Sequence, residues 1–142
     1  MRTHCCINGV INMDILKGWK PVFIENSPIP VWLSKIAPLE IYAICLGPIV
    51  FARGNVSAHL RRHETIHWQQ MIELLIVGHV LLYCWDWMKG RIRYHKDWQG
   101  YASPGNKAYF RTRAEQEAYH SAPDERYLEK RRRWQWLWNY CV

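Results

Sequence analysis

The chain has 142 residues, 49% of them hydrophobic, and carries 19 Lys and Arg against 12 Asp and Glu, a formal net charge of +7. This length and apolar content suffice for one compact core, and the composition excludes collagen-like, coiled-coil and low-complexity proteins. The positive charge is spread over both halves of the chain and forms no basic arm, so we do not expect nucleic acid as a partner.

The N-terminal residues differ in character from the rest of the chain. Organised sequence begins at Trp19, so residues 1–18 are expected to form a poorly ordered appendage, with Met13 as an alternative to Met1 as the functional start. The first residues lack the apolar run of a secretory signal. The five cysteines form no C-x-x-C pair and do not resemble a disulfide framework. We therefore expect reduced thiols and a cytoplasmic protein.

Two apolar stretches invite comparison with a membrane span. Residues 37–52 are interrupted by Glu40 and by Gly47-Pro48, and residues 71–87 are interrupted by three polar side chains. A transmembrane helix needs about 18 to 20 uninterrupted apolar residues. Both stretches are therefore predicted to be core elements, and no transmembrane span is expected.

Strand-forming sequence is confined to the first third of the chain. Residues 19–25, WKPVFIE, contain β-forming residues with a proline near the start, which predicts a short edge strand. Residues 39–53 are β-branched and apolar, with Gly47-Pro48 as a turn between two short strands. A buried helix before Gly47 is the alternative for this segment.

Helical sequence follows. A helix is expected to begin at a cap on Asn55 or Ser57 and to run to Gly78, where a bend leads into a second helix over residues 79–89. Residues 63, 67, 70, 74 and 77 are expected to share one face of the first helix.

The last third of the chain alternates loop and helix signals. Residues 90–106 contain three glycines and a proline and predict the longest loop. Asn106 is expected to cap a helix over residues 107–122, and residues 121–124, SAPD, are expected to start a last helix that runs to Tyr140. That last helix would align Tyr127, Arg131, Trp134 and Trp138 in one stripe and leave residues 131–133, RRR, mostly in water.

The segment His63-Glu64-Thr65-Ile66-His67 carries the strongest chemical signal. Side chains four residues apart on a helix lie about 5–6 Å apart at Cβ, so both imidazoles can bind one ion at the roughly 2.0–2.1 Å that zinc prefers. Glu64 lies about 100° round the helix and cannot join them as a ligand. It can instead take a proton from a water molecule at the metal. The alternative is an exposed His-rich helix face.

A zinc site of this kind needs a third protein ligand and an open position for water. Glu115, in RAEQEAY, is the strongest candidate; it lies 48 residues beyond His67 and within another predicted helix. Glu117 lies two residues further on and points to a nearly opposite side, so the two cannot bind the same ion. Spacing alone does not choose between them.

This arrangement resembles the gluzincin zinc metallopeptidases, in which an HExxH helix is followed much later by a Glu on a second helix. In the prenyl-protease-like branch that Glu occurs as E-x-x-A-D, and residues 115–119, EQEAY, match it with Tyr119 in place of Asp. The resemblance implies that Glu115 is the third ligand.

The chain is more closely similar to a family of small, mostly uncharacterised bacterial and phage proteins that look like stand-alone zincin cores. The matching segments are Pro48 to Phe51, His63 to His67 with Gln70, Glu73-Leu74, Ala108-Tyr109, Glu115 to Tyr119, and Tyr127-Leu128 with Arg131. The resemblance covers residues 19–140. It departs at Gln69-Gln70 and at Ala114, where the relatives carry Phe, and these positions affect packing more than ligation. It implies no particular substrate.

Four further side chains near the motif each have two interpretations. Tyr119 could donate to a developing oxyanion or be a packed ring, and His120 could polarise a carbonyl or be solvated. Gln70 could orient a ligand or be an amide at the edge of the core. His59 lies one turn before His63 and is expected to be solvated, although it could compete as a ligand.

Two charged features lie outside the motif. Glu73 sits in an apolar run, where an unpaired charge is costly, so Arg62 or Arg111 is expected to pair with it. Arg111 and Arg113 could also polarise a carbonyl instead of lying at a solvated surface. Residues 130–138, KRRRWQWLW, could bind phosphates or lipid head groups. The favoured interpretation is that the tryptophans pack in the core and the arginines face water.

Together these features predict an α+β fold: a mainly helical single domain over residues 19–142 with a small β-sheet beside the HExxH helix. The expected function is that of a zinc metallopeptidase acting on a peptide or protein substrate, with Zn²⁺ held by His63, His67 and Glu115 and with Glu64 as general base. Two rivals are a non-catalytic zinc-stabilised module and a basic, Trp-rich protein that binds nucleic acid or a membrane surface. The oligomeric state is left open.

Overall fold

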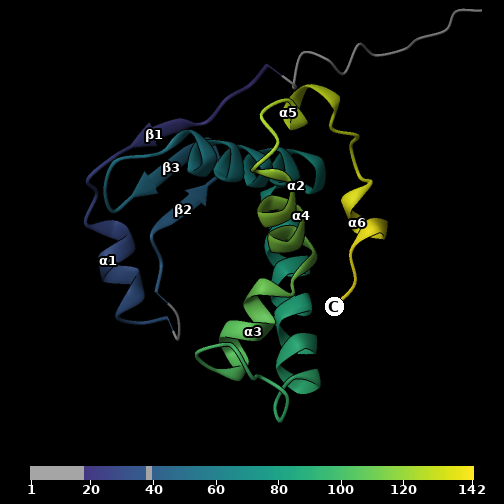
Figure 1. Ribbon diagram of the computed structural model, residues 1–142. Coiled ribbons are helices and arrows are strands. Elements are labelled where there is room, and N and C mark those ends of the chain that lie inside the picture. The colour runs from purple at the N-terminus through teal and green to yellow at the C-terminus, as the bar shows by residue number, and fades with distance from the viewer. Residues whose placement is uncertain (1–17, 38–39) are drawn as a thin grey trace, which may run out of the picture.

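The computed structural model describes residues 18–37 and 40–142 as one mixed α+β domain that is mainly helical, as predicted (Figure 1). The expectations for residues 1–17 lie outside the described residues. The elements are β1 (Val22–Ile24), α1 (Ile29–Ser34), β2 (Ala43–Leu46), β3 (Ile49–Ala52), α2 (Ala58–Arg93), α3 (Pro104–Phe110), α4 (Arg113–Ser121), α5 (Tyr127–Lys130) and α6 (Trp136–Asn139).

The sheet has three short strands in the order β1-β3-β2. Strand β1 runs parallel to β3 and lies at one edge, while β2 and β3 form an antiparallel hairpin. Gly47 at the hairpin turn has φ +65°, and a Cβ at this position would lie 3.2 Å from Cδ1 of Ile76. Glycine suits this position for two reasons: it adopts a positive φ without strain, and it has no Cβ to obstruct the close approach of α2. The predicted edge strand and the predicted pair of strands are confirmed.

Helix α2 is a single long element with a bend inside it. The hydroxyl of Ser57 caps its start by accepting from the backbone N–H of Leu60 at 3.2 Å. Leu75 has φ 56° and ψ 156°, which divides α2 into an N-terminal arm, residues 58–74, and a C-terminal arm, residues 76–93. The prediction of a bend at Gly78 was wrong. Gly78 stays helical, and the chain turns where its packing partners change.

The two arms of α2 pack against different parts of the molecule. In Figure 1 the N-terminal arm lies along the sheet, and the C-terminal arm runs beside α3 and α4. Trp68 and Met71 of the N-terminal arm pack on Cys45 and Val50 of the sheet. Burying one large apolar side chain contributes about 1.5–3 kcal/mol, so this small cluster is what fixes the HExxH segment against the sheet. The cluster is completed by the half-buried Phe23, Ala43 and Ile72.

The helix predicted over residues 107–122 is divided in two. Ser103 caps α3 by accepting from Asn106 N at 3.0 Å, so Asn106 is not the cap. The first helix ends at Phe110, and Thr112 starts the second, because its hydroxyl accepts from the backbone N–H of Glu115 at 3.3 Å. Since α2 continues to Arg93 and α3 begins at Pro104, the intervening loop is shorter than predicted.

The single helix predicted at the C-terminus was also wrong. Two one-turn helices, α5 and α6, flank an irregular segment in which Arg131 has ψ 130° and Trp134 has φ 63°. Arg131 is buried instead of facing water, and Trp136 packs inside while Trp134 and Trp138 are exposed. The segment folds around the buried guanidinium, which a continuous surface helix would not allow.

Among the described residues, α2 is the one helix long and apolar enough to cross a membrane when judged by length and composition alone. Helices in the cores of other proteins pass the same test. Its N-terminal arm is mostly buried against the sheet, while the C-terminal arm has one face against α3 and α4 and leaves the other exposed. The prediction that residues 71–87 form a core element was therefore wrong for the outward face.

Candidate metal centre

Three ligand-type side chains meet where α2 and α4 lie against each other. The ligand atoms of His63, His67 and Glu115 all lie within 4.8 Å of one another. The two imidazole Nε2 atoms are 3.1 Å apart, and Glu115 Oε2 and Oε1 lie 3.5 Å and 3.4 Å from Nε2 of His63 and His67 respectively. The structure therefore brings the two motif histidines together with Glu115, and all three residues are buried.

The donor set fits a zinc ion. Two imidazole nitrogens and a carboxylate, with a further position open, are a ligand set that zinc accepts. Among the described residues, Oε2 of Glu115 is a buried atom without a hydrogen-bond partner, although it points toward His63. A buried, unsatisfied carboxylate oxygen is costly, and a cation bound between it and the two Nε2 atoms would satisfy it.

Gln70 determines which nitrogen of His67 carries the proton. Its amide Nε2 donates to Glu117 Oε2 at 2.6 Å and to the backbone oxygen of Ala114 at 3.1 Å. Its Oε1 must therefore accept, and it lies 2.9 Å from His67 Nδ1. With the proton on Nδ1, the Nε2 lone pair of His67 points toward His63 and Glu115, as a metal ligand requires. Gln70 is thus a fully buried orienting amide.

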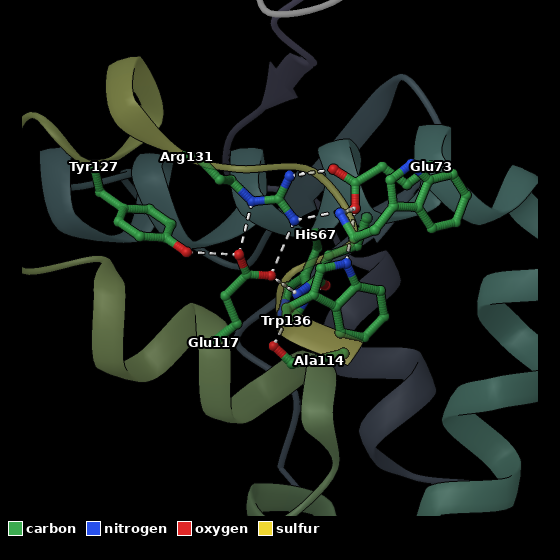
Figure 2. Close-up of polar contacts among 9 residues, drawn as sticks. His67, Glu73, Ala114, Glu117, Tyr127, Arg131 and Trp136 are labelled. Atoms are coloured by element: carbon green, nitrogen blue, oxygen red, sulfur yellow. Dashed lines mark hydrogen bonds and ion pairs between the residues drawn. The ribbon is translucent and has the colours of Figure 1, made fainter. Parts of the chain in front are cut away.

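Behind Gln70 lies a buried ion network that links α2, α4 and the C-terminal segment (Figure 2). Glu117 accepts from Arg131 Nε at 2.7 Å and from Tyr127 Oη at 2.7 Å. Arg131 also donates to Glu73, which accepts from Trp136 Nε1 at 2.7 Å. Glu117 is therefore held by Arg131 and faces away from the histidines, while Glu115 lies beside them.

The expected partners of Glu73 were wrong. Its cation is Arg131, 58 residues along the chain, and neither Arg62 nor Arg111. Arg62 instead donates from Nε to the backbone oxygen of Ala122 at 2.7 Å. The pairing depends on the fold of the C-terminal segment, so the local sequence around Glu73 carries no signal for it.

Glu64 is buried on α2 between the two motif histidines in sequence. Burial raises the pKa of its carboxyl to about 7, the charge of His67 opposes that rise, and the charge of Glu115 adds to it. A carboxyl group with a pKa near neutrality can both accept and donate a proton at physiological pH.

The charges of His63, His67 and Glu115, the three candidate ligands, are coupled. Burial alone would lower the pKa of His67, but the Glu115 carboxylate outweighs burial and raises it to about 9. Burial lowers the pKa of His63 in spite of the same carboxylate. Burial would raise the pKa of Glu115, yet the two imidazoles hold it well below its usual range. Without a cation, the Glu115 carboxylate therefore keeps His67 protonated. A metal ion bound at the two imidazoles would displace that proton.

Two polar side chains of the C-terminal arm also lie at the site, and sequence reasoning missed both. Tyr83 donates from Oη to Glu115 Oε1 at 3.0 Å. His79 is buried with its ring centroid 6.5 Å from that of His67, and burial lowers its pKa to about 4. Both reach the site because α2 bends at Leu75, and a leucine gives no signal for a bend.

Tyr119 and His120 occupy different positions. The ring of Tyr119 meets that of His63 edge to face with centroids 4.6 Å apart, and Tyr119 is 45% exposed, so it forms the solvent-facing side of the site. The ring of His120 lies beside that of Tyr140 instead, with centroids 6.4 Å apart. Tyr119, His120 and Tyr140 border a surface hollow of about 630 Å³. The structure does not bring His120 to the three ligand residues.

His59 is exposed, as expected, one turn before His63. Arg113 is held by a buried partner: its Nη2 donates to Asp86 Oδ1 at 2.8 Å, so it braces α4 against the C-terminal arm. Neither residue has a described contact with the three ligand residues.

No protein-family model, no curated protein and no solved structure matches this chain. The assignment of a function therefore rests on the geometry and chemistry of the His63–His67–Glu115 site.

Proposed function

We propose that the protein is a zinc-dependent hydrolase of peptide bonds. The observation that carries the proposal is the convergence of His63, His67 and Glu115, whose ligand atoms lie within 4.8 Å of one another, with Gln70 holding His67 in the ligating tautomer. When bound, zinc would supply Lewis acidity, which lowers the pKa of a water molecule and polarises a carbonyl group.

In this proposal Glu64 moves the protons. It follows His63 directly on α2, and its buried carboxyl group has a pKa raised to about 7. Glu64 accepts a proton from the attacking water and delivers it to the leaving amine nitrogen. It is not a metal ligand, because its place on the helix turns it away from the face shared by His63 and His67.

Tyr119 is the side chain best placed to meet a substrate. Its ring packs against His63 at the exposed side of the site. Burial and the Glu115 carboxylate raise its pKa to about 12, so the phenol keeps its proton and can donate a hydrogen bond to a carbonyl oxygen. The hollow that Tyr119 shares with Phe110 and Tyr140 offers apolar rings beside which a peptide chain could lie.

The test is the substitution Glu64→Gln, which keeps the size of the side chain and removes the proton acceptor. Hydrolysis of a fluorescein-labelled unfolded protein by the zinc-loaded chain is expected to fall at least about 100-fold, because general acid–base catalysis contributes that much. Zinc content is expected to stay at the level of the parent. Glu40→Gln, at an exposed carboxylate on the surface, is the matched control. Unchanged hydrolysis in Glu64→Gln would contradict the proposal.

A second candidate function is a structural zinc module without catalysis. The observation that favours it is burial: His63, His67 and Glu115 are only 5%, 7% and 3% exposed, and Glu64 is 5% exposed. In such a module, metal binding contributes folding free energy. Full zinc content, a large loss of thermal stability on chelation and no hydrolysis by the parent chain would support this candidate over the hydrolase.

A further inference from the structure

The C-terminal arm of α2 has an inverted distribution of polar and apolar side chains. Its inward face, against α3 and α4, carries His79, Asp86 and Gly90, all of them buried. Asp86 is 1% exposed and pairs with Arg113 of α4. The helix thus places polar and small residues inside, which is the reverse of a helix packed on an apolar core.

The outward face of the same arm is apolar. Seven large side chains on it are between 48% and 76% exposed: Ile76, Val77, Val80, Leu81, Trp85, Met88 and Ile92. Successive members are one, three or four residues apart, which places them on one broad side of the helix, a stripe along about 25 Å at about 1.5 Å per residue. A contiguous apolar stripe of this length on a protein surface marks a contact with another molecule or with a membrane.

The charge around the stripe has one sign. Lys89, Arg91 and Arg93 lie in the last turns of the arm and Lys96 lies three residues beyond it, and all four residues are exposed. Between residues 74 and 96 the sequence contains one acid, Asp86, which is buried and paired. The exposed surface of the arm therefore joins an apolar stripe to a cluster of positive charges. The nearest exposed acid in the sequence, Asp97, pairs with Lys107.

We propose that this face binds the surface of an anionic lipid bilayer. The arm lies in the plane of the interface, with its apolar stripe among the upper acyl chains and its lysines and arginines at the lipid phosphates. Lipid is favoured over a second copy of the chain because each copy carries a net charge of +7, and two copies would repel each other where an anionic membrane attracts. The proposal is independent of the hydrolytic function.

The inward face of the arm limits how deeply it can insert. Tyr83 contacts Glu115 at 3.0 Å, and Asp86 holds Arg113, so one side of the arm is fixed to α4. A helix that crossed the bilayer would expose these groups to lipid at a high cost. The arm therefore lies on the membrane as one face of the folded domain.

The test is co-sedimentation of the full chain with two kinds of vesicle: phosphatidylcholine alone, and phosphatidylcholine with phosphatidylglycerol. Binding is expected to the anionic vesicles and to weaken as salt is raised, since the lysines and arginines contribute. The double substitution Leu81→Glu with Trp85→Glu is expected to reduce binding at least about 10-fold, because it places charge in the middle of the stripe. Lys89→Gln is expected to reduce it about fivefold.

The matched control is Trp32→Glu on α1, where the side chain is 60% exposed and as large, but lies on another part of the molecule. It is expected to bind as the parent does. All variants change exposed positions, and circular dichroism checks that each is folded. Equal loss of binding in Trp32→Glu would overturn the proposal. The proposal would also be overturned if the chain bound neither kind of vesicle and instead formed a dimer. In that case the double substitution at Leu81 and Trp85 would dissociate the dimer.

Discussion

The Nδ1 atom of His67 lies 2.9 Å from Oε1 of Gln70, and the amide that supplies this oxygen has both of its hydrogens directed at other acceptors. This hydrogen bond therefore fixes the tautomer of His67, a proposed metal ligand, through the ring nitrogen that would not bind the metal. Groups in this position raise the basicity of the ligand and hold its ring in place.

Replacing Gln70 by Ala removes this acceptor. We expect zinc affinity to fall about 10- to 100-fold, because the His67 ring loses its orientation and its preferred tautomer. Competition with a chelator of known affinity measures the change. Gln69→Ala, at the neighbouring buried glutamine, is the control and should keep the affinity of the parent. Equal affinities of parent and Gln70→Ala would show that Gln70 only fills space.

Replacing Arg131 by Leu leaves two buried carboxylates, Glu73 and Glu117, without their cation. We expect the free energy of unfolding to fall by about 3–5 kcal/mol, as is usual when one partner of a buried ion pair is removed. Urea denaturation measures it. The control Arg132→Leu changes an exposed neighbour and should cost less than about 0.5 kcal/mol. A loss no greater than the control's would mean that the network adds nothing to stability.

The pH dependence of the metal-free chain tests the burial of Glu64. Its pKa rises from 4.5 in the unfolded chain to about 7 in the folded one. As pH rises, the carboxyl group therefore loses its proton at a lower pH in the unfolded chain than in the folded one. The free energy of unfolding falls as pH rises from about 4.5 to 7. In excess chelator, Glu64→Gln is expected to be more stable than the parent at pH 8 by up to about 3 kcal/mol.

At pH 4, where the carboxyl group of Glu64 is protonated in both states, Glu64→Gln and the parent should have nearly equal stability. Urea denaturation at the two pH values makes the comparison, with Glu40→Gln as the exposed control. A parent that is as stable as Glu64→Gln at pH 8 would contradict the buried, raised-pKa carboxyl group.

Leu75 holds a backbone conformation, φ 56° and ψ 156°, that is essentially restricted to glycine, and its side chain is 76% exposed. Leu75→Gly is therefore expected to raise the free energy of unfolding by about 1 kcal/mol, after the greater freedom of glycine in the unfolded chain is subtracted. Val77→Gly, at an exposed helical position, should instead lower it by about 0.5 kcal/mol. A destabilised Leu75→Gly would contradict a strained bend.

The parts of the site that depend on local spacing were predictable from the sequence. His63 and His67 share a helix face by their separation alone, and the hairpin around Gly47 follows from its β-branched flanks. The choice of Glu115 needed a family resemblance, because spacing left Glu117 equally open.

The parts that depend on tertiary packing were not predictable. Tyr83 reaches Glu115 only because α2 bends at Leu75, an exposed leucine whose conformation the packing of the two arms imposes. Arg131 lies in a run of three arginines, a pattern typical of a solvated helix surface. Its burial depends on Glu73, 58 residues away, and on Glu117, 14 residues away. Local propensity carries no information on pairings at such separations.

The most direct test of the central claim is the zinc content of the purified chain and of three variants: His67→Ala, Glu115→Ala and Glu117→Gln. Elemental analysis of protein purified without added metal is expected to find close to one zinc ion per parent chain, little in His67→Ala and Glu115→Ala, and retained zinc in Glu117→Gln. Zinc that persists in Glu115→Ala, or a parent chain that neither carries nor takes up zinc, would contradict the account.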